Sequence, residues 1–238
     1  MKLAHRSSLI ATCGLAALTL SGCQKAANPT PTVPPQASQV HTASAPPRER
    51  SDSQRKTILA AAERFENLTE AAFDGAKPTA AALALAHRDA QTARPLLDAS
   101  EAATLDRQLH SVDAAAANDV AADVSLAAVE AYRTLITASD GEGKIPLLVG
   151  LLDYSGFRFW ADAKAAPPRW ADMTAARDYA AAQWALVKPR IHDPAAIRKF
   201  EGALGAMASA VARQNSTAAV KAGTLELDLV DELEKLVV

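Results

Sequence analysis

Apolar residues recur every three or four positions throughout the chain beyond about residue 52, and this spacing limits the possible folds more than any other property of the sequence. Ala is abundant there, Gly and β-branched residues are sparse inside the periodic stretches, and no stretch alternates between apolar and polar residues with a period of two. The pattern predicts an all-α fold, an up-down bundle of about eight helices, over residues 52–238.

Helix-ending and helix-capping residues divide this region. Gly75, Pro95 and Pro189 follow periodic stretches, and Asp98 with Glu101 three positions later forms a predicted capping box. Pro146 opens a helix that we expect to be interrupted near Gly156. The predicted helices cover about 53–74, 79–93, 98–116, 119–138, 146–166, 170–188, 193–213 and 217–238.

The periodicity also predicts which helix faces are buried. The expected buried face of the fourth helix is made of Val120, Val124, Ala128, Ala131 and Leu135. That of the last helix is made of Ala222, Leu225, Leu229, Leu233 and Leu236. Glu226 is expected at the edge of this second face, and Asp228 and Asp231 on its wet side.

The helical region partly repeats itself when it is shifted by about 94 to 96 residues. Phe65 then falls on Phe159, Arg94-Pro95 on Lys188-Pro189, and Glu130 on Glu226. This alignment indicates two copies of a four-helix unit, 52–140 and 145–238, although Ala-rich helices also align by chance. Two small bundles and one bundle with a shared core both fit the pattern.

The first 22 residues are predicted to be a signal peptide. Lys2 and Arg6 precede an apolar run of about 12 residues, whereas a permanent membrane span takes about 20. The residues Leu20-Ser21-Gly22-Cys23 resemble the lipobox of bacterial lipoproteins. The resemblance implies cleavage before Cys23 and a covalent lipid on Cys23. No other cofactor is expected. The alternative is an ordinary secretory signal in which Cys23 is incidental.

Residues 23–51 are predicted to form a disordered tether. Six prolines are interleaved with Thr, Ser, Ala and Gln, so the segment buries too little apolar surface to offset the entropy of ordering. A chain of this length typically reaches about 30 Å.

The residue after the cysteine indicates which membrane holds the chain. By resemblance to enteric lipoproteins, Asp at this position would favour the inner membrane, and this chain has Gln24. We therefore expect the chain to be anchored at the periplasmic face of the outer membrane.

Charge and cysteine content exclude several classes of function. The sequence has a formal net charge of −2, and cleavage of the leader would remove Lys2 and Arg6, so nothing indicates a basic surface for nucleic acid. Cys13 lies in the leader, which leaves Cys23 as the single cysteine of the mature chain. A disulfide and a cysteine-based metal site are therefore excluded.

One segment is unusually rich in aromatic residues. Tyr154, Phe157, Phe159 and Trp160 surround Arg158, and adjacent rings at 159 and 160 cannot both face one core. These five residues are a candidate surface for an envelope protein partner, since Trp, Tyr and Arg are enriched at binding hot spots. The favoured alternative is that the rings fill the core between Ala-rich helices. Gly156 indicates a close backbone approach or a kink there.

A second candidate site surrounds a histidine. Asp106 precedes His110 by one helical turn and Asp113 follows it by one turn, which permits a metal-binding column. His110-x-x-Asp113 is similar to the His-x-x-Glu motif of imelysin-like periplasmic iron proteins, which are also duplicated helical bundles. This chain has Asp in place of Glu, and its second repeat, at 204–207, offers no ligand. The more ordinary interpretation is a set of solvated charges beside a histidine.

No sequence motif of an enzyme is present. The chain lacks a Ser-His-Asp arrangement with an elbow turn and a Gly-rich phosphate loop, and no carboxylate pair is expected in a cleft. The sequence therefore predicts a membrane-anchored periplasmic lipoprotein with a binding or scaffolding role. A periplasmic metal-handling protein that uses Asp106, His110 and Asp113 is the alternative.

Overall fold

Local sequence sets where the helices begin and end. The computed structural model describes residues 50–73, 76–118, 120–140 and 145–237. Within them, Asp98 and Glu101 form the predicted capping box, with reciprocal backbone-to-carboxylate hydrogen bonds of 2.8 Å. The Asp193 carboxylate accepts a hydrogen bond of 2.7 Å from the amide of Ala195, next to Pro194 in the first helical turn.

The described residues form eight α-helices and no strand, which confirms the predicted all-α bundle. The helices are α1 (Asp52–Phe73), α2 (Ala80–Ala93), α3 (Ala99–Asn118), α4 (Ala121–Asp140), α5 (Ile145–Lys164), α6 (Trp170–Val187), α7 (Pro194–Ala212) and α8 (Ser216–Val237). Short 3-10 turns, η1 (Arg94–Leu96) and η2 (Lys188–Arg190), follow α2 and α6. Cys23, the predicted leader and the predicted tether up to residue 49 lie outside the described residues.

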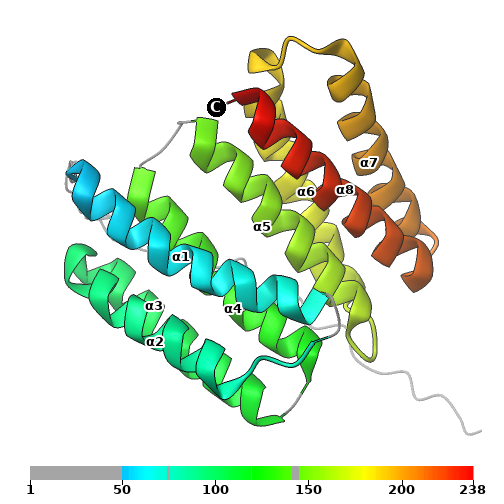
Figure 1. The fold of residues 1–238 in the computed structure, drawn as a ribbon. Helices are drawn as coiled ribbons and strands as arrows, with labels where there is room; N and C mark the ends of the chain where they lie inside the picture. Colours follow the sequence, from blue (N-terminus) through cyan, green and yellow to red (C-terminus); the bar gives the residue numbers. More distant parts are fainter. Residues whose placement is uncertain (1–49, 74–75, 119, 141–144, 238) are drawn as a thin grey trace, which may run out of the picture. The chain divides into compact units, whose positions relative to one another are not determined.

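The helices pack in two sets whose main contacts correspond, although α6 also contacts α7 and no comparable α2–α3 contact occurs among the described residues. In the first set, α1 contacts α2 and α4, and α3 contacts α4 (Figure 1). In the second, α5 contacts α6 and α8, and α7 contacts α8. The α4–α5 contact joins the two sets, with a smaller contribution from α1 and α5.

The two sets share core residues. The core around Phe65, Leu105 and Leu135 also contains side chains from the second set. These are Leu147, Leu151, Tyr154 and Phe157 of α5, and Leu227 of α8. Two further apolar clusters lie among α5, α6, α7 and α8. The predicted repeats are therefore not two separate bundles in the described structure, because α5 completes the core of the first set.

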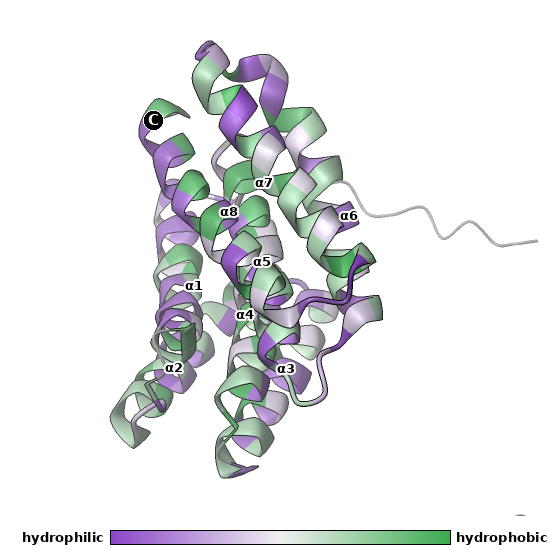
Figure 2. Cartoon of the chain, turned by 90° about the vertical axis from the view of Figure 1, so that its right-hand side faces the viewer, coloured by the Kyte–Doolittle hydropathy of each residue, from purple (hydrophilic) through white to green (hydrophobic). Residues whose placement is uncertain are grey.

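Three details of the predicted helix faces are wrong. Val120 precedes α4 and is 45% exposed, while Leu225 and Leu236 of α8 are 44% and 53% exposed. The buried face of α8 is turned toward Glu226, Leu227 and Val230 instead. Hydrophilic and hydrophobic positions alternate around this helix (Figure 2), so α8 is amphipathic as expected.

α5 is also continuous through Gly156, whereas an interruption was expected. The glycine allows close packing: a Cβ atom there would lie 1.9 Å from Oε2 of Glu226 and 2.7 Å from a methyl carbon of Leu227.

Among the described helices, none is long and apolar enough to cross a membrane.

Candidate functional site

The aromatic segment of α5 lies inside the protein. Tyr154, Phe157, Phe159 and Trp160 are each at most 5% exposed. Phe157 packs edge to face against Phe73 with ring centroids 6.2 Å apart, and Trp160 lies 4.7 Å from the same ring. A recognition surface made of these rings would need them exposed, so the geometry favours the alternative, in which they fill the core.

Arg158 takes part in an internal polar network that joins α5 to α4. Its guanidinium pairs with the Glu130 carboxylate and donates a hydrogen bond of 3.0 Å to the Tyr154 hydroxyl. That hydroxyl donates to Glu130 over 2.8 Å. Asp162, one turn further along α5, lies 4.0 Å from the same guanidinium. Arg158 is half-buried, and these contacts give it a structural role.

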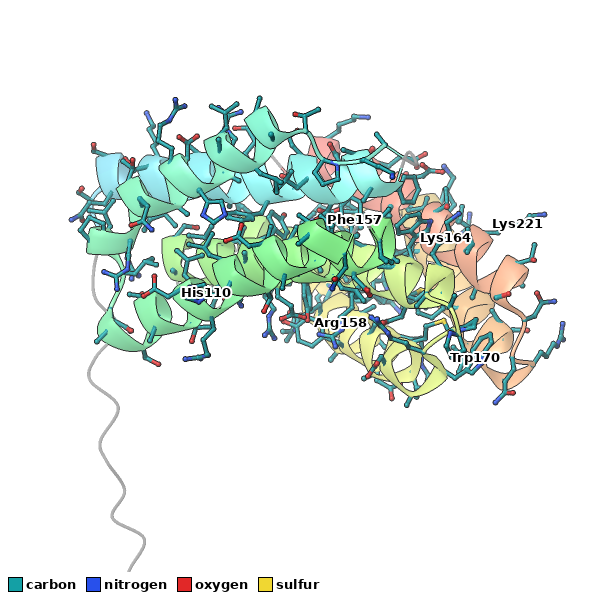
Figure 3. All side chains as sticks on the ribbon, turned by 90° about the horizontal axis from the view of Figure 1, so that it is seen from below. His110, Phe157, Arg158, Lys164, Trp170 and Lys221 are labelled. Atoms are coloured by element: carbon teal, nitrogen blue, oxygen red, sulfur yellow. The ribbon has the colours of Figure 1, made fainter. Side chains whose placement is uncertain are left out.

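The predicted histidine column is engaged elsewhere. Asp106 accepts two hydrogen bonds from Arg94, of 2.8 and 2.7 Å, and Asp113 lies 2.7 Å from Nε2 of His87. His110 is exposed on α3, well apart from Phe157 and Arg158 on α5 (Figure 3). Throughout the described part of the chain, no group of three or more His, Cys, Asp or Glu side chains is arranged to hold a metal ion.

A cavity of about 270 Å³ opens between α1, α5 and α8. We call it the acidic cavity, because six of the nine described residues that line it carry carboxyl groups and none is Lys or Arg. The acids are Glu66 and Glu70 of α1, Asp153 of α5, and Asp228, Asp231 and Glu234 of α8; Phe73, Phe157 and Leu227 complete the lining. The expectation that no carboxylate pair lies in a cleft was therefore wrong.

Asp153 marks the inner end of the acidic cavity. It is 6% exposed, whereas Asp228, Asp231 and Glu234 are exposed and so lie toward solvent. Its Oδ2 atom is buried and has no hydrogen-bond partner. A buried polar atom without a partner is costly, and few occur in natural proteins. The position therefore calls for an explanation beyond packing.

Burial and mutual repulsion change the acidity of this group of acids. Burial first, then the charges of Glu70 and Glu234, raises the pKa of Glu66 to about 7, although a hydrogen bond with Asp153 opposes the rise. Burial, followed by the charge of Glu66, holds the pKa of Asp153 well above its usual value. The inner acids therefore hold protons at a pH at which exposed carboxyls are ionised.

Glu226 does not line the acidic cavity and lies against Gly156, at the crossing of α5 and α8. Its side chain is fully buried, and neither of its carboxyl oxygens has a hydrogen-bond partner. Burial raises the pKa of Glu226 well above its usual value, and its charge would raise the pKa of Asp153 further. Glu226 therefore adds negative potential at the inner end of the acidic cavity whenever it is ionised.

Sequence reasoning missed Asp153, Glu66 and Glu226 as site residues. A signal for Asp153 was present: it is the one acid among the ten residues from Leu147 to Gly156, in a strongly apolar stretch of α5. An acid within such an apolar stretch is expected either to be buried in the core or to belong to a binding or catalytic site. Glu66 carried no such signal, because its role depends on the approach of α5 and α8 to α1.

The arrangement is suited to binding a positive charge. Carboxyls with a raised pKa can also transfer protons. However, the described lining provides no histidine, cysteine or hydroxyl nucleophile and no cationic group to stabilise an anion. A cation would neutralise the repulsion among the acids.

Comparisons with protein families, with curated proteins and with solved structures give no match for this chain, so its site has to be interpreted from its own geometry.

Proposed function

We propose that this chain is a lipid-anchored binding protein of the bacterial cell envelope, whose helical unit takes up a cationic ligand in the acidic cavity. The observation that carries the proposal is Asp153, a nearly buried acid with an unpartnered oxygen in a cavity lined by six carboxyl groups. Leu20-Ser21-Gly22-Cys23 supports the location, through its resemblance to a lipobox.

The positions of the buried and the solvent-accessible side chains favour a binding role over a scaffolding role. The aromatic residues first considered for a protein partner are in the core, whereas the acidic cavity is open to solvent at its α8 side. Like charges held close together resist ionisation, and a bound cation offsets that cost. Ligand binding is therefore expected to stabilise the folded chain, and the stabilisation should rise with the logarithm of the free ligand concentration once that exceeds Kd.

Thermal unfolding of the full chain, purified in detergent, tests cation binding. The probes are divalent metal ions and organic ammonium compounds at pH 7.5 and constant ionic strength. At least one probe should raise the melting temperature progressively with concentration, and Asp153→Asn should abolish the increase. Asp178→Asn, at a 62% exposed carboxylate on α6, is the matched control and should behave as wild type.

If no probe raises the melting temperature of the wild-type chain above the effect of sodium chloride, the binding function is wrong. The binding function is also wrong if the melting temperatures of Asp153→Asn and Asp178→Asn change alike as probe is added.

Fractionation of cells that make the full chain tests the anchor. The wild-type chain should sediment with membranes and carry acyl groups on Cys23 in the mass spectrum of its amino-terminal peptide. Cys23→Ala should release the chain from membranes. An unacylated Cys23 in the membrane fraction would contradict the lipid anchor and leave the cation-binding test unaffected.

A further inference from the structure

We infer that α2 is a flap, kept closed by polar bridges to α3, which opens about η1 while the rest of the helical unit stays folded. The inference is independent of the proposed cation binding, since no described lining residue of the acidic cavity comes from α2. Three features of α2 carry it: the size of its buried side chains, the helices that it contacts, and the way its two ends are held.

The side chains that α2 buries are small. All of them are alanines: Ala86, Ala90 and Ala93. α6 contacts α5 as α2 contacts α1, but it buries larger side chains beside its alanines: Met173, Trp184 and Val187. Hydrophobic stabilisation scales with the apolar area removed from water, and a methyl side chain removes little. One ion pair of 2.9 Å, between Arg64 and Asp89, adds to the contact with α1. α2 is therefore held to the core less firmly than α6.

Among the described helices, α2 packs closely on α1 alone (Figure 1). α6, in contrast, contacts both α5 and α7. Polar side chains bridge α2 and η1 to α3: a hydrogen bond of 2.7 Å joins His87 and Asp113, and Arg94 donates two hydrogen bonds to Asp106. All four side chains are at least 32% exposed, and exposed pairs add little to stability. Little therefore opposes the separation of α2 from α3.

The two ends of α2 are held differently. At the carboxyl-terminal end, the Arg50 guanidinium donates a hydrogen bond of 3.2 Å to the carbonyl of Leu96 in η1 and also pairs with Glu101. Leu97, next to this turn, is 6% exposed. At the amino-terminal end, residues 80–85 include no buried side chain. α2 therefore opens from its amino-terminal end, and η1 is the hinge.

The core that α2 closes is made of large apolar side chains. The alanines of α2 belong to the same cluster as Phe65 of α1 and Leu105, Leu109 and Val112 of α3, each at most 5% exposed. Opening uncovers the part of this cluster that lies under α2. The flap thus gives the helical unit a way to present apolar surface without unfolding.

Hydrogen exchange of the full chain in detergent, read by mass spectrometry at pH 7.5, tests this inference. Peptides from α2 should exchange at least about tenfold faster than peptides from α1 and α6. Their rates should hardly change in low concentrations of urea, because a local opening exposes little surface. If α1, α2 and α6 exchange at one common rate that rises steeply with urea, α2 opens only by global unfolding and the inference is wrong.

The reactivity of introduced cysteines gives a second measurement. Ala90→Cys on α2 and Ala180→Cys on α6 replace alanines that are both 0% exposed. A thiol reagent should modify Ala90→Cys at least about tenfold faster than Ala180→Cys under native conditions. Peptide mass spectrometry separates these labels from any label on Cys13 or Cys23. Equal rates, or a faster reaction of Ala180→Cys, would overturn the inference.

A matched pair of variants tests the polar bridges. Asp106→Ala removes the partner of Arg94, and Glu201→Ala removes the corresponding partner of Lys188 in the second set. Asp106→Ala should speed exchange in α2 by about threefold and leave α6 unchanged. Glu201→Ala should leave the exchange of α2 unchanged. Equal exchange of α2 in the two variants would contradict its closure by the bridges to α3.

Discussion

Glu66 is the residue whose acidity has the clearest consequence for the stability of the fold. Its pKa rises from 4.5 to about 7 on folding, mainly through burial and then through repulsion from Glu70 and Glu234. Between these two pH values the folded chain holds a proton that the unfolded chain has lost. The protonated carboxyl thus stabilises the fold in acid, and ionisation at higher pH destabilises it.

Urea unfolding from pH 4 to pH 9 measures this linkage. The free energy of unfolding should fall as pH rises from about 4.5 through about 7, with a slope of up to about 1.4 kcal/mol per pH unit for each proton, and the raised pKa values of Asp153 and Glu226 should extend the fall to higher pH. Glu66→Gln should reduce the fall between pH 4.5 and 7, and Glu63→Gln, at the exposed acid one turn earlier, should leave it in place. Parallel curves for the two variants would show that Glu66 is not responsible.

The contacts of a residue were predictable from the sequence where its partners lie within the same helical turn. The Asp98–Glu101 capping box formed as expected, because both partners lie within one turn of helix. Glu226 was expected at the edge of an apolar face and is instead fully buried. Its surroundings depend on how α8 is rotated against α5, and short-range periodicity leaves that rotation undetermined by about one residue.

At the scale of helices, the crossing of α5 and α8 depends on two glycines. Gly156 on α5 lies against Glu226 and Leu227, and a Cβ atom on Gly223 of α8 would lie 3.2 Å from the Cβ atom of Trp160. Both positions allow the helix backbones to approach closely. The sequence indicated a close approach or a kink at Gly156, and the structure shows the close approach in a continuous helix.

Gly156→Ala tests the importance of this crossing. The added methyl group would overlap Glu226 and Leu227, so the free energy of unfolding should fall by about 1–3 kcal/mol. Gly202→Ala is the matched control, since nothing lies within 4 Å of the position of its Cβ atom in α7. That variant should gain up to about 1 kcal/mol from helix propensity. Equal effects of the two substitutions in urea unfolding would contradict close packing at Gly156.

At the scale of the whole helical unit, the two sets of four helices are expected to unfold together because their cores are shared. Leu147, Leu151, Tyr154 and Phe157 of α5 are buried against side chains of the first set. The helix count was predictable from periodicity and breaks. Whether the two sets share a core was left open, because a pattern of apolar positions does not indicate which helix packs against which face.

The shared core predicts that the first set is not stable alone. Residues 45–140 expressed without α5 should lose cooperative unfolding, since each missing large apolar contact is worth roughly 1.5–3 kcal/mol. The full chain should show one calorimetric transition, with equal calorimetric and van't Hoff enthalpies. Two separate transitions in the full chain, or a cooperative melt of the 45–140 fragment at the same temperature, would contradict this.

The acidic cavity is lined by α1 and α8, the first and last helices described, together with α5. Chains are synthesised from the amino terminus, so α1 is made long before α8. The proposed ligand site would therefore be complete only when the last helix has docked, and a chain cut short before α8 would lack half of the acids in the cavity. Only a chain whose synthesis and folding are complete would then bind the proposed ligand. A nascent or truncated copy could not compete for it.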